Sequence, residues 1–586
     1  AAARPDAIAL EYGDQQISYA GLMAGSDAIA KALQDLRIGT GGRVAVALPR
    51  SIEGVAALLA VMKTGNAYVP LDPAQPPARL RMILENADVA AVIHDQEALP
   101  DYATGLDLPA LPLDKAEIGG TPAPVETSGT DSAYVMFTSG STGTPKGVEI
   151  GHRAVVNLLT SMAREPGFAD TDVLLAVTTV MFDISVLEMF LPLIRGGRTV
   201  IAAHEDVLDG FKLVHRLNKG DITHMQATPT LWRMVLEAGY APKPGFTMLA
   251  GGEPLPADLA DQLTAGGATL WNVYGPTETT IWSAISRIDP GTPVTIGHPV
   301  ANTTLHVLGP QDQLLPPGTV GELNIGGAGL AKGYFRRADL TAEAFRDVTV
   351  NGRTERLYRT GDLARRLADG TLQVLGRNDG QIKLRGFRIE LGEVETALRA
   401  LDGVANAAAA LRPSPRGDAQ LVGYIVCEAG CDPAPETLSL ALSDRLPGYM
   451  VPSAWVFLSA LPQTANGKLD RKALPDPQAA ATVTALHSEP KSATEQQMAG
   501  IWCEVLGLDT VSTTQTLFAL GADSLTVFRI AARMIDAGLN VEARHLLQYP
   551  TIAQLAAFAD STGGDRGGPK KPSLKAYRRD ARRGTT

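Results

Sequence analysis

The chain has 586 residues, of which 45% are hydrophobic and 20% are charged, and its net charge is -11. This length predicts three or four domains, and the composition is typical of folded globular protein rather than of a disordered chain or a membrane span. The acidic balance argues against a nucleic-acid partner, because a phosphate backbone is bound by a basic surface. Cys427, Cys431 and Cys503 lack metal-site spacing, which is typical of a protein from the reducing cytoplasm.

Residues 1–378 alternate short β-rich runs with amphipathic stretches. The run RVAVAL at 43–48, for example, precedes a helical pattern at 51–65. Such alternation predicts an α/β fold with largely parallel sheets. We therefore expect one large α/β domain over residues 1–378.

The pattern changes near Gly376. A turn at 376–380 is followed by a strand-like segment at 381–389, then by a helical pattern and a further strand. These elements predict a small α+β domain over residues 379–475, with the turn as a hinge. Residues 476–490 are rich in Pro and Ala, as in a linker.

The last folded segment, residues 491–562, has helical periodicity. Ser492 and Glu495 have the spacing of a capping box. A second helix is predicted to begin at Ser524, with one side formed by Leu525, Phe528, Ala531 and Ile535. We expect a small helical bundle. Residues 563–586 carry eight Lys or Arg against two Asp, which favours a disordered linker or tail over a docking segment.

The loop TSGSTGTPKG, residues 138–147, follows an apolar run. Its small and hydroxyl residues can surround a phosphate group while a lysine adds positive charge, and the candidates are Thr138, Ser139, Gly140, Ser141, Thr142 and Lys146. Pro145 and Gly147 break the P-loop pattern, so the loop taken alone could also be a flexible surface turn.

Ten motifs in a fixed order resemble the adenylation domains of nonribosomal peptide synthetases, within the adenylate-forming superfamily. They cover nearly all of the first 475 residues. The motifs are ISYAGL, VMKTGNAYVPLD, the phosphate loop, FDISVLEMF, NVYGPTETT, GELNIGGAGLAKGYF, YRTGDL, GRNDGQIKLRGFRIELGEVE, LPGYMVP and NGKLDR. The resemblance implies an ATP-dependent ligase with a large N-terminal domain and a small C-terminal subdomain.

The resemblance also implies how the nucleotide is bound. Tyr274 would stack on adenine and Asn272 would hydrogen-bond it, while Asp362 would bind both ribose hydroxyls with Arg377 nearby. Relatives often place a second aromatic ring over adenine, but the matching position is Val374.

The implied first step is attack of an amino-acid carboxylate on the α-phosphate of ATP, giving an aminoacyl-AMP and pyrophosphate. Two anions must meet, so cations are needed where charge accumulates. By resemblance Thr277 and Glu278 contact phosphate and Mg²⁺, with Glu278 as the metal ligand, and Lys468 of NGKLDR is catalytic. Asp379 resembles the family's hinge residue, about which the small domain could withdraw Lys468 after adenylation.

The segment TLFALGADSL, residues 516–525, resembles the phosphopantetheine attachment motif of peptidyl carrier proteins. Ser524 would carry the phosphopantetheine, and a helix N-terminus suits its phosphodiester. Ala522 replaces a usual glycine, and without the bundle Ser524 would be an ordinary N-cap. The implied partners are a phosphopantetheinyl transferase and upstream and downstream synthetase domains, and the resemblance raises an MbtH-like protein as a further candidate.

The resemblance further implies an amino-acid substrate. Asp183 would bind its ammonium group and Lys468 its carboxylate. The pocket positions carried over from the family are Asp183, Ile184, Leu187, Gln226, Leu249, Gly251, Val273, Ile281, Trp282 and Lys468. This set resembles the family's glycine pattern, because bulky side chains such as Trp282 could fill the volume of a substrate side chain.

Two alternatives remain open. A ligase similar to acyl-coenzyme A synthetases would release its product to a soluble thiol, although Asp183 and the carrier segment argue against it. The second alternative is a binding scaffold whose catalytic domain has lost its activity. An assay of ATP–pyrophosphate exchange would distinguish such a scaffold from an active ligase.

Overall fold

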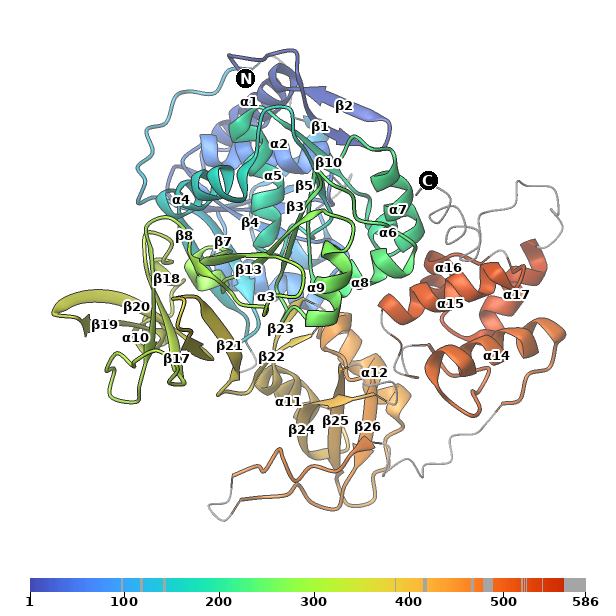
Figure 1. The fold of residues 1–586 in the computed structure, drawn as a ribbon. Helices are drawn as coiled ribbons and strands as arrows, with labels where there is room; N and C mark the ends of the chain where they lie inside the picture. Colours follow the sequence, from blue (N-terminus) through green and yellow to red (C-terminus); the bar gives the residue numbers. More distant parts are fainter. Residues whose placement is uncertain are drawn as a thin grey trace.

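The computed structural model describes residues 1–95, 99–115, 120–140, 144–384, 386–414, 419–464, 468–477, 488–517, 520, 522, 524–539 and 541–562. The expected fold is confirmed: a large α/β domain precedes a smaller α+β domain and a helical carrier region (Figure 1). Among these residues no helix combines the length and apolar character that crossing a membrane requires.

The first sheet of the large domain has nine strands in the order β15-β14-β13-β12-β11-β9-β10-β1-β2. Its centre, from β1 to β13, is parallel, while β2, β14 and β15 are antiparallel additions at the edges. The strands span Ile8–Tyr12 (β1), Gln15–Ser18 (β2), Val173–Ala176 (β9), Arg198–Ile201 (β10), His224–Ala227 (β11), Thr247–Gly251 (β12), Thr269–Tyr274 (β13), Ala284–Ile288 (β14) and His298–Pro299 (β15).

The second sheet has seven strands in the order β18-β8-β7-β4-β3-β5-β6. Strands β7 and β8 form an antiparallel pair, and the candidate phosphate loop connects them. The strands span Arg43–Ala47 (β3), Ala67–Leu71 (β4), Ala91–His94 (β5), Ala110–Pro112 (β6), Ser132–Thr138 (β7), Lys146–Gly151 (β8) and Gly333–Tyr334 (β18).

Helices fill the space between the two sheets and cover their outer faces. One core cluster joins strands of both sheets to α1, α2, α4 and α5, so these four helices form a shared apolar layer. A second cluster places α7, α8 and α9 on the other face of the nine-stranded sheet. The helices span Tyr19–Asp35 (α1), Ile52–Lys63 (α2), Pro77–Ala87 (α3), His152–Met162 (α4), Ile184–Arg195 (α5), His204–Val207 (α6), Gly210–Asn218 (α7), Pro229–Glu237 (α8), Ala257–Thr264 (α9) and Ala338–Ala344 (α10).

A five-stranded sheet completes the large domain, and its β20 and β21 lead into the small domain. Its strands span Thr303–Leu308 (β16), Gly321–Gly327 (β17), Phe345–Val350 (β19), Arg353–Arg366 (β20) and Leu372–Arg377 (β21). The small domain contains the strands Val404–Pro413 (β24), Ala419–Cys427 (β25) and Ala454–Phe457 (β26) with the helices Leu391–Arg399 (α11) and Pro435–Ser443 (α12).

The expectation of a single strand at 381–389 is wrong. This segment forms the two antiparallel strands β22 (Gln381–Leu384) and β23 (Phe387–Glu390). Gly386 lies at the turn with a φ of +82°, and a Cβ there would come within 2.5 Å of Thr228 Cγ2. A residue with a side chain is therefore disfavoured both by its backbone conformation and by the neighbouring large domain.

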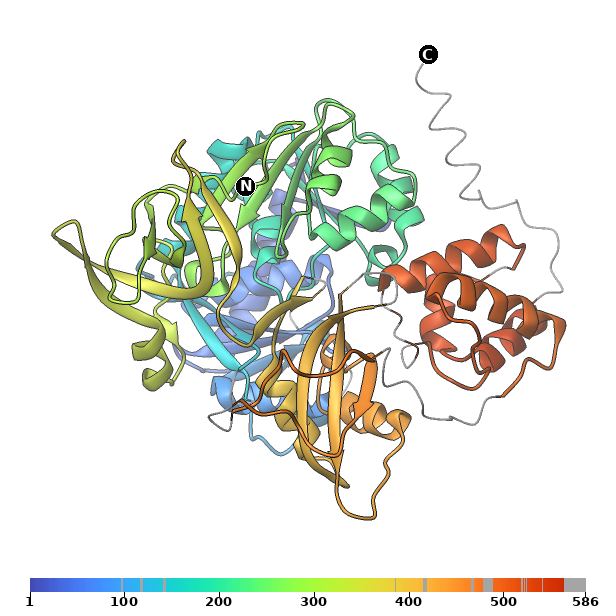
Figure 2. The same cartoon turned by 60° about the horizontal axis from the view of Figure 1, so that its bottom comes forward.

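The carrier region contains α14 (Ala493–Leu506), α15 (Ser524–Asp536), α16 (Ala543–Gln548) and α17 (Ile552–Thr562). Ser492 and Glu495 form the predicted capping box. The apolar stripe of α15 is divided: Ala531 packs in the carrier core, whereas Leu525 and Phe528 pack against the large domain. Both ribbon views place the carrier beside the large domain near α8 (Figure 2).

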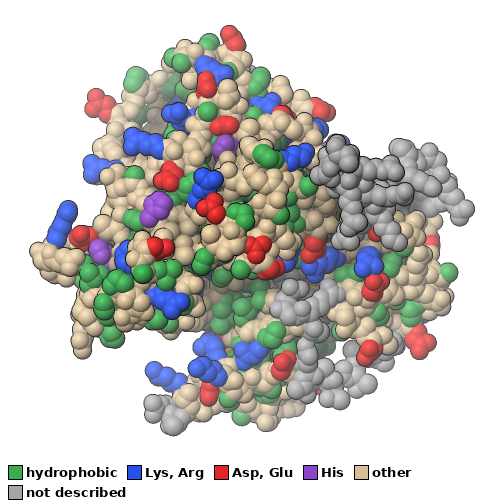
Figure 3. Space-filling model, viewed as in Figure 1, with side chains coloured by type: hydrophobic (Ala, Val, Ile, Leu, Met, Phe, Trp, Pro, Cys, Tyr) green, Lys and Arg blue, Asp and Glu red, His purple; other side chains and the backbone are tan. Residues whose placement is uncertain are grey.

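Acidic and basic side chains are interspersed over the described part of the face in Figure 3. The basic residues expected at 563–586, and residues 478–487 of the expected linker, lie outside the described residues. The visible charges are those of an ordinary solvated surface.

Candidate active site

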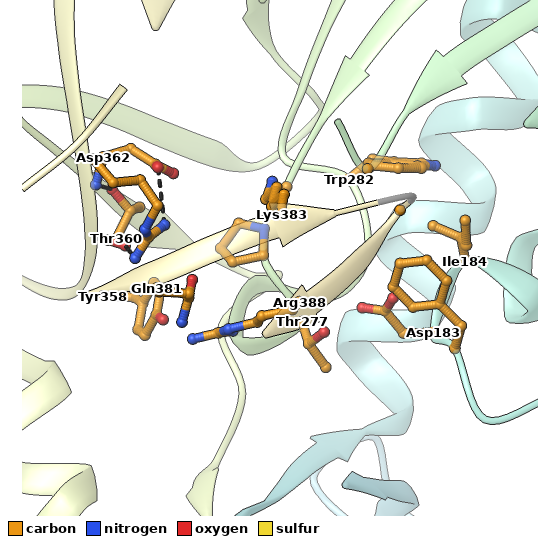
Figure 4. A pocket seen from close by; sticks show the side chains of 16 residues that line it. Asp183, Ile184, Thr277, Trp282, Tyr358, Thr360, Asp362, Gln381, Lys383 and Arg388 are labelled. Carbon is orange, nitrogen blue, oxygen red and sulfur yellow. Dashed lines mark hydrogen bonds and ion pairs between the residues drawn. The ribbon is translucent and has the colours of Figure 1, made fainter. Parts of the chain in front are cut away.

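A cleft between the large and small domains brings together many of the candidate residues (Figure 4). Its walls combine α5, the segment after β13, strand β20 and the β22–β23 hairpin. The lining residues are Phe182, Asp183, Ile184, Gly252, Gly275, Pro276, Thr277, Trp282, Tyr358, Thr360, Asp362, Arg377, Gln381, Lys383, Gly386 and Arg388.

Asp183 lies at the N-terminus of α5 and projects into the cleft (Figure 4). Only 4% of the residue is exposed. Burial raises the pKa of its carboxyl to about 6, while a hydrogen bond from Thr277 opposes this rise. At neutral pH the group is therefore still largely an anion, and it can pair with a ligand ammonium group.

Trp282 closes the same part of the cleft opposite Ile184 (Figure 4). The two residues before it, Thr280 and Ile281, have φ values of +62° and +69°, which β-branched residues rarely adopt. Such strain persists where surrounding contacts fix the backbone, here through the Thr280 hydroxyl, which donates to the Gly329 carbonyl at 2.7 Å. The indole is thereby held in a defined place.

The other predicted pocket residues on the large domain do not line the cleft. They are buried directly behind it: Leu187, Gln226, Leu249, Gly251, Val273 and Ile281. The structure thus brings Asp183, Ile184 and Trp282 to the cleft surface and places the other six in the layer that supports them.

Glu278 lies at the end of the cleft nearest the phosphate loop and is fully buried. Its Oε1 accepts a hydrogen bond from the Tyr334 hydroxyl at 2.6 Å and lies 3.7 Å from Lys146 Nζ. Burial would raise the pKa of Glu278, but the charges of Arg388 and Lys146 outweigh burial and lower it well below the usual range. A permanently ionised carboxylate fits Mg²⁺, which proteins hold through one or two carboxylates together with substrate phosphates.

The small domain contacts these phosphate-side groups directly. Arg388 Nη1 lies 2.7 Å from Glu278 Oε2, and the Arg388 carbonyl accepts from the Ser139 hydroxyl at 2.9 Å. Glu393 Oε2 accepts from the backbone N–H of Gly140 at 3.1 Å, and its Oε1 pairs with Arg79 at 2.9 Å. In this arrangement small-domain groups therefore occupy donors and charges that a polyphosphate and its metal would use.

The remaining phosphate-loop candidates are only partly placed. Thr138 ends β7 and its hydroxyl lies 3.5 Å from the Lys146 carbonyl. Burial lowers the pKa of Lys146, and the charge of Arg388 lowers it further. Ser141 and Thr142 lie outside the described residues.

The predicted nucleotide residues form a second group along β13, β20 and β21. The Tyr274 hydroxyl donates to Asp362, whose Oδ1 pairs with Arg377 Nη1 at 2.8 Å. Lys383 Nζ lies 5.5 Å from the centre of the Tyr274 ring. The Asn272 side-chain amide donates to the Thr295 carbonyl at 2.7 Å. Neither Asn272 nor Tyr274 lines the cleft, and a lysine lies over the ring expected to stack on adenine.

The expected hinge residue, Asp379, is held by Arg377. The guanidinium Nε and Nη2 lie 2.8 and 2.6 Å from the two carboxylate oxygens. The charge of Arg377 lowers the pKa of Asp379 despite its burial. This pair fixes the connection between β21 and the hairpin in the observed orientation.

Lys468, the expected catalytic lysine, also lies away from the cleft lining. It is exposed on the small domain, next to the bridge between Gln463 and Leu469. The reason is the orientation of that domain, which turns the β22–β23 hairpin, and not Lys468, toward the site. Ser524 begins α15, the carrier helix that contacts α8 of the large domain.

Sequence reasoning did not single out Lys383, Arg388 and Glu393, all of which lie within the quoted motif at 376–395. The available signal was the alternation of polar and apolar residues in β22 and β23, which places Lys383 between Ile382 and Leu384 and Arg388 between Phe387 and Ile389. That signal cannot say which domain the charges face.

Comparison with protein-family models finds three matches along the chain. They are the AMP-binding enzyme over residues 1–335, its C-terminal domain over residues 393–468, and the phosphopantetheine attachment site over residues 496–559.

Relatives and solved structures agree with this order of domains. A dimodular nonribosomal peptide synthase of Bacillus subtilis is 43% identical over 95% of the chain, and tyrocidine synthase 3 of Brevibacillus parabrevis is 38% identical over 94%. The chain spans 24% and 9% of these two proteins. A holo structure containing adenylation and carrier domains, bound to a vinylsulfonamide inhibitor, is 26% identical with a TM-score of 0.81, covering 96% of this chain and 95% of that one.

A four-domain nonribosomal peptide synthetase, solved with AMP and glycine, is 37% identical with a TM-score of 0.61, and the match covers 95% of this chain and 42% of that one. The chain therefore belongs to the AMP-binding enzyme family, as an adenylation domain followed by a phosphopantetheine carrier domain.

Proposed function

We propose that the chain activates glycine with ATP as glycyl-AMP and then transfers the glycyl group to the phosphopantetheine thiol on Ser524, for nonribosomal peptide synthesis. The observation that carries this proposal is the pairing of a buried carboxylate, Asp183, with a buried indole, Trp282, at one end of the cleft. Asp183 binds the ammonium group of the amino acid, and Trp282 leaves little room for a side chain on its α-carbon.

The size argument rests on the layer behind the cleft. Leu187, Val273 and Ile281 are each at most 2% exposed, so the wall cannot move back without displacing packed core. The solved relative whose title names AMP and glycine supports the same substrate.

For adenylation we assign the ribose hydroxyls to Asp362, the adenine to Tyr274 and Asn272, and the phosphates to Thr277, Lys146 and the loop at 138–142. Magnesium, held by Glu278 and phosphate oxygens, would neutralise charge as the carboxylate attacks. Lys468 would provide a further cation at that step. It must approach the cleft for this, so adenylation requires a different orientation of the small domain, reached by rotation about Asp379.

The orientation described here suits the second step. The β22–β23 hairpin closes the phosphate end, and the carrier lies against the large domain. The thiol would attack the acyl carbon of glycyl-AMP, forming the thioester and releasing AMP. We assign loading to this state and adenylation to the state with Lys468 in place.

The partners follow from the same scheme. A phosphopantetheinyl transferase supplies the prosthetic group, and neighbouring synthetase domains supply peptide-bond formation and release. An MbtH-like protein remains a proposed partner of the large domain, tested by co-expression and size-exclusion chromatography. The free thiols of Cys427, Cys431 and Cys503 favour the cytoplasm as the location.

Substrate choice is tested by kcat/KM for glycine, alanine, serine and leucine in pyrophosphate exchange. We expect glycine to be preferred and alanine to be accepted weakly, since one methyl group is worth about 1–3 kcal/mol of discrimination. Trp282→Ala should raise kcat/KM for alanine relative to that for glycine. It should also lower the stability of the protein, because the substitution leaves a cavity. A wild-type preference for leucine, or unchanged ratios in the variant, would contradict the glycine proposal.

A further inference from the structure

Behind the cleft, Trp282 is held by a buried chain of hydrogen bonds. Its Nε1 donates to Gln226 Oε1 at 2.8 Å. Gln226 Nε2 in turn donates to the Ile184 carbonyl at 3.0 Å and to Glu188 Oε1 at 3.2 Å. Because both acceptors face the amide nitrogen, the amide oxygen must face the indole. The orientation of Gln226 is therefore set from its far side.

Glu188 forms that far side. It lies one turn after Ile184 on α5, has no exposed surface and does not line the cleft. Its Oε2 accepts from the backbone N–H groups of Val177 and Thr178 at 3.1 and 3.0 Å, and its Oε1 accepts from the Thr178 hydroxyl at 2.7 Å as well as from Gln226. All its neighbours in this network donate to it, and the ionised carboxylate, which only accepts, satisfies all of them. Burial raises the pKa of Glu188 to about 7, and the hydrogen bonds from Thr178 and Gln226 oppose this rise.

The opposite end of the indole is fixed by close packing. A Cβ built on Gly251 would lie 2.6 Å from Trp282 Cη2 and 2.6 Å from Val273 Cγ2. The ring therefore fits only because residue 251 has no side chain. The indole ring of Trp282 is therefore confined between the side-chain amide of Gln226 and the backbone of β12.

We propose that Glu188 is a specificity-determining positioning residue, which acts through Gln226 on Trp282 and thereby sets how small an activated amino acid must be. This inference rests on the proposed function, in that it takes the cleft as the amino-acid site. Without an acceptor at position 188 only the Ile184 carbonyl still holds the Gln226 amide with its oxygen toward the indole, so the flipped amide, which sets N–H against N–H at the indole, becomes more populated. The indole would then shift and open space for a methyl group.

The test is a double-mutant cycle between Glu188→Gln and Trp282→Phe. Glutamine keeps the size of Glu188 but turns an NH₂ group toward donors. We expect Glu188→Gln to raise the alanine-to-glycine ratio of kcat/KM by about tenfold, the lower end of what one methyl group is worth. Phenylalanine cannot donate to Gln226, so Glu188→Gln should leave the ratio unchanged in the Trp282→Phe background.

Gln226→Met provides a second route to the same result if Glu188→Gln does not fold. Methionine has about the volume of glutamine but cannot make the hydrogen bonds to Trp282 and Glu188. The variant should therefore reproduce the raised alanine-to-glycine ratio of kcat/KM. Asp221→Asn is the matched control, because Asp221 pairs with Arg198 and Arg216 on the outer part of the same domain. It should reduce stability without altering the ratio.

The inference is overturned if Glu188→Gln and Gln226→Met fold but leave the ratio unchanged, or if Glu188→Gln shifts the ratio equally in both backgrounds. Failure of the proposed function looks different. If the wild type prefers another amino acid, the same cycle is measured with that amino acid and its homologue one methyl group larger. The coupling then tests Glu188 independently of glycine.

Discussion

At the scale of single residues, the proposed role of Asp183 at the ammonium site predicts that substrate binding depends on pH. Burial raises the pKa of this carboxyl to about 6, so the acid is ionised above that value and protonated below it. A protonated acid cannot pair with the substrate ammonium group. We expect kcat/KM for glycine to be level near neutral pH and to fall about tenfold per unit below about pH 6.

The pH profile of pyrophosphate exchange measures this dependence directly. Asp183→Asn is the matched variant. It should have a lower kcat/KM, and its pH profile should show no inflection near the pKa at which the wild-type profile falls. A melting curve at each pH separates loss of binding from unfolding. A flat wild-type profile across the slightly acid range would remove Asp183 from the ammonium site.

Sequence patterns could identify residues such as Asp183 and Glu278, because each stands in a contiguous motif. They could not identify Glu188 as a support for Trp282, because its role depends on Gln226, which reaches this helix residue from strand β11. Nor could they place Lys383 over Tyr274, since that contact joins two domains. A motif identifies residues that are close in sequence, whereas these roles arise from contacts between residues that are distant in sequence.

At the scale of elements, the β22–β23 hairpin and the start of α11 should matter for loading and not for adenylation. In this orientation of the small domain Arg388 and Glu393 bind Glu278 and the phosphate loop, and we expect rotation of the domain to break these contacts. A buried charge-assisted hydrogen bond is worth about 1.5–3 kcal/mol, so losing one should lower the population of this state by roughly 10- to 160-fold. Arg388→Ala and Glu393→Gln should therefore slow loading and preserve exchange.

The two rates are measured separately, by pyrophosphate exchange and by thioester formation on the carrier. Arg445→Ala is the control, because Arg445 lies on the same domain and donates to the Ala400 carbonyl. An equal loss of both rates in the hairpin variants would show that the hairpin is not specific to loading.

The division of the 381–389 segment into two strands shows where sequence patterns fail at this scale. Alternating residues predict a strand, but the turn depends on Gly386, whose left-handed backbone faces Thr228 and whose N–H donates to Glu253 at 2.5 Å. Both partners belong to the large domain. The hairpin therefore takes its shape partly from a surface that is distant in sequence, with Glu253 lying 133 residues before Gly386.

At the scale of the whole molecule, α15 connects the carrier to the large domain. Phe528 packs with Phe211 at 5.1 Å between ring centres, and Arg529 forms two hydrogen bonds to Glu237 at 2.6 and 2.8 Å. We expect Glu237→Arg and Arg529→Glu each to slow loading by up to about fivefold, or ~1 kcal/mol for a partly exposed pair, with exchange unchanged. The double exchange should recover part of the loss.

This rescue is measured by loading rates at low and high salt, because screening should shrink the effect of the single variants. If the doubly exchanged protein loads no faster than the single variants at low salt, the ion pair does not guide docking. The sequence predicted both domains but not the contact between them. The apolar side of α15 was predicted as one surface, whereas in the structure part of it packs in the carrier core and part packs against the large domain.

The central claim is that one chain performs two separable half-reactions, activation in the cleft and loading of Ser524. The most direct measurement combines pyrophosphate exchange with the intact mass of the protein after phosphopantetheinylation and incubation with ATP and mixed amino acids. The wild type should gain one phosphopantetheine and one glycyl group, Ser524→Ala should retain exchange and gain neither, and Lys468→Ala should lose most exchange. A folded Ser524→Ala protein that has lost exchange, or that still gains a covalent amino acid, would contradict the account.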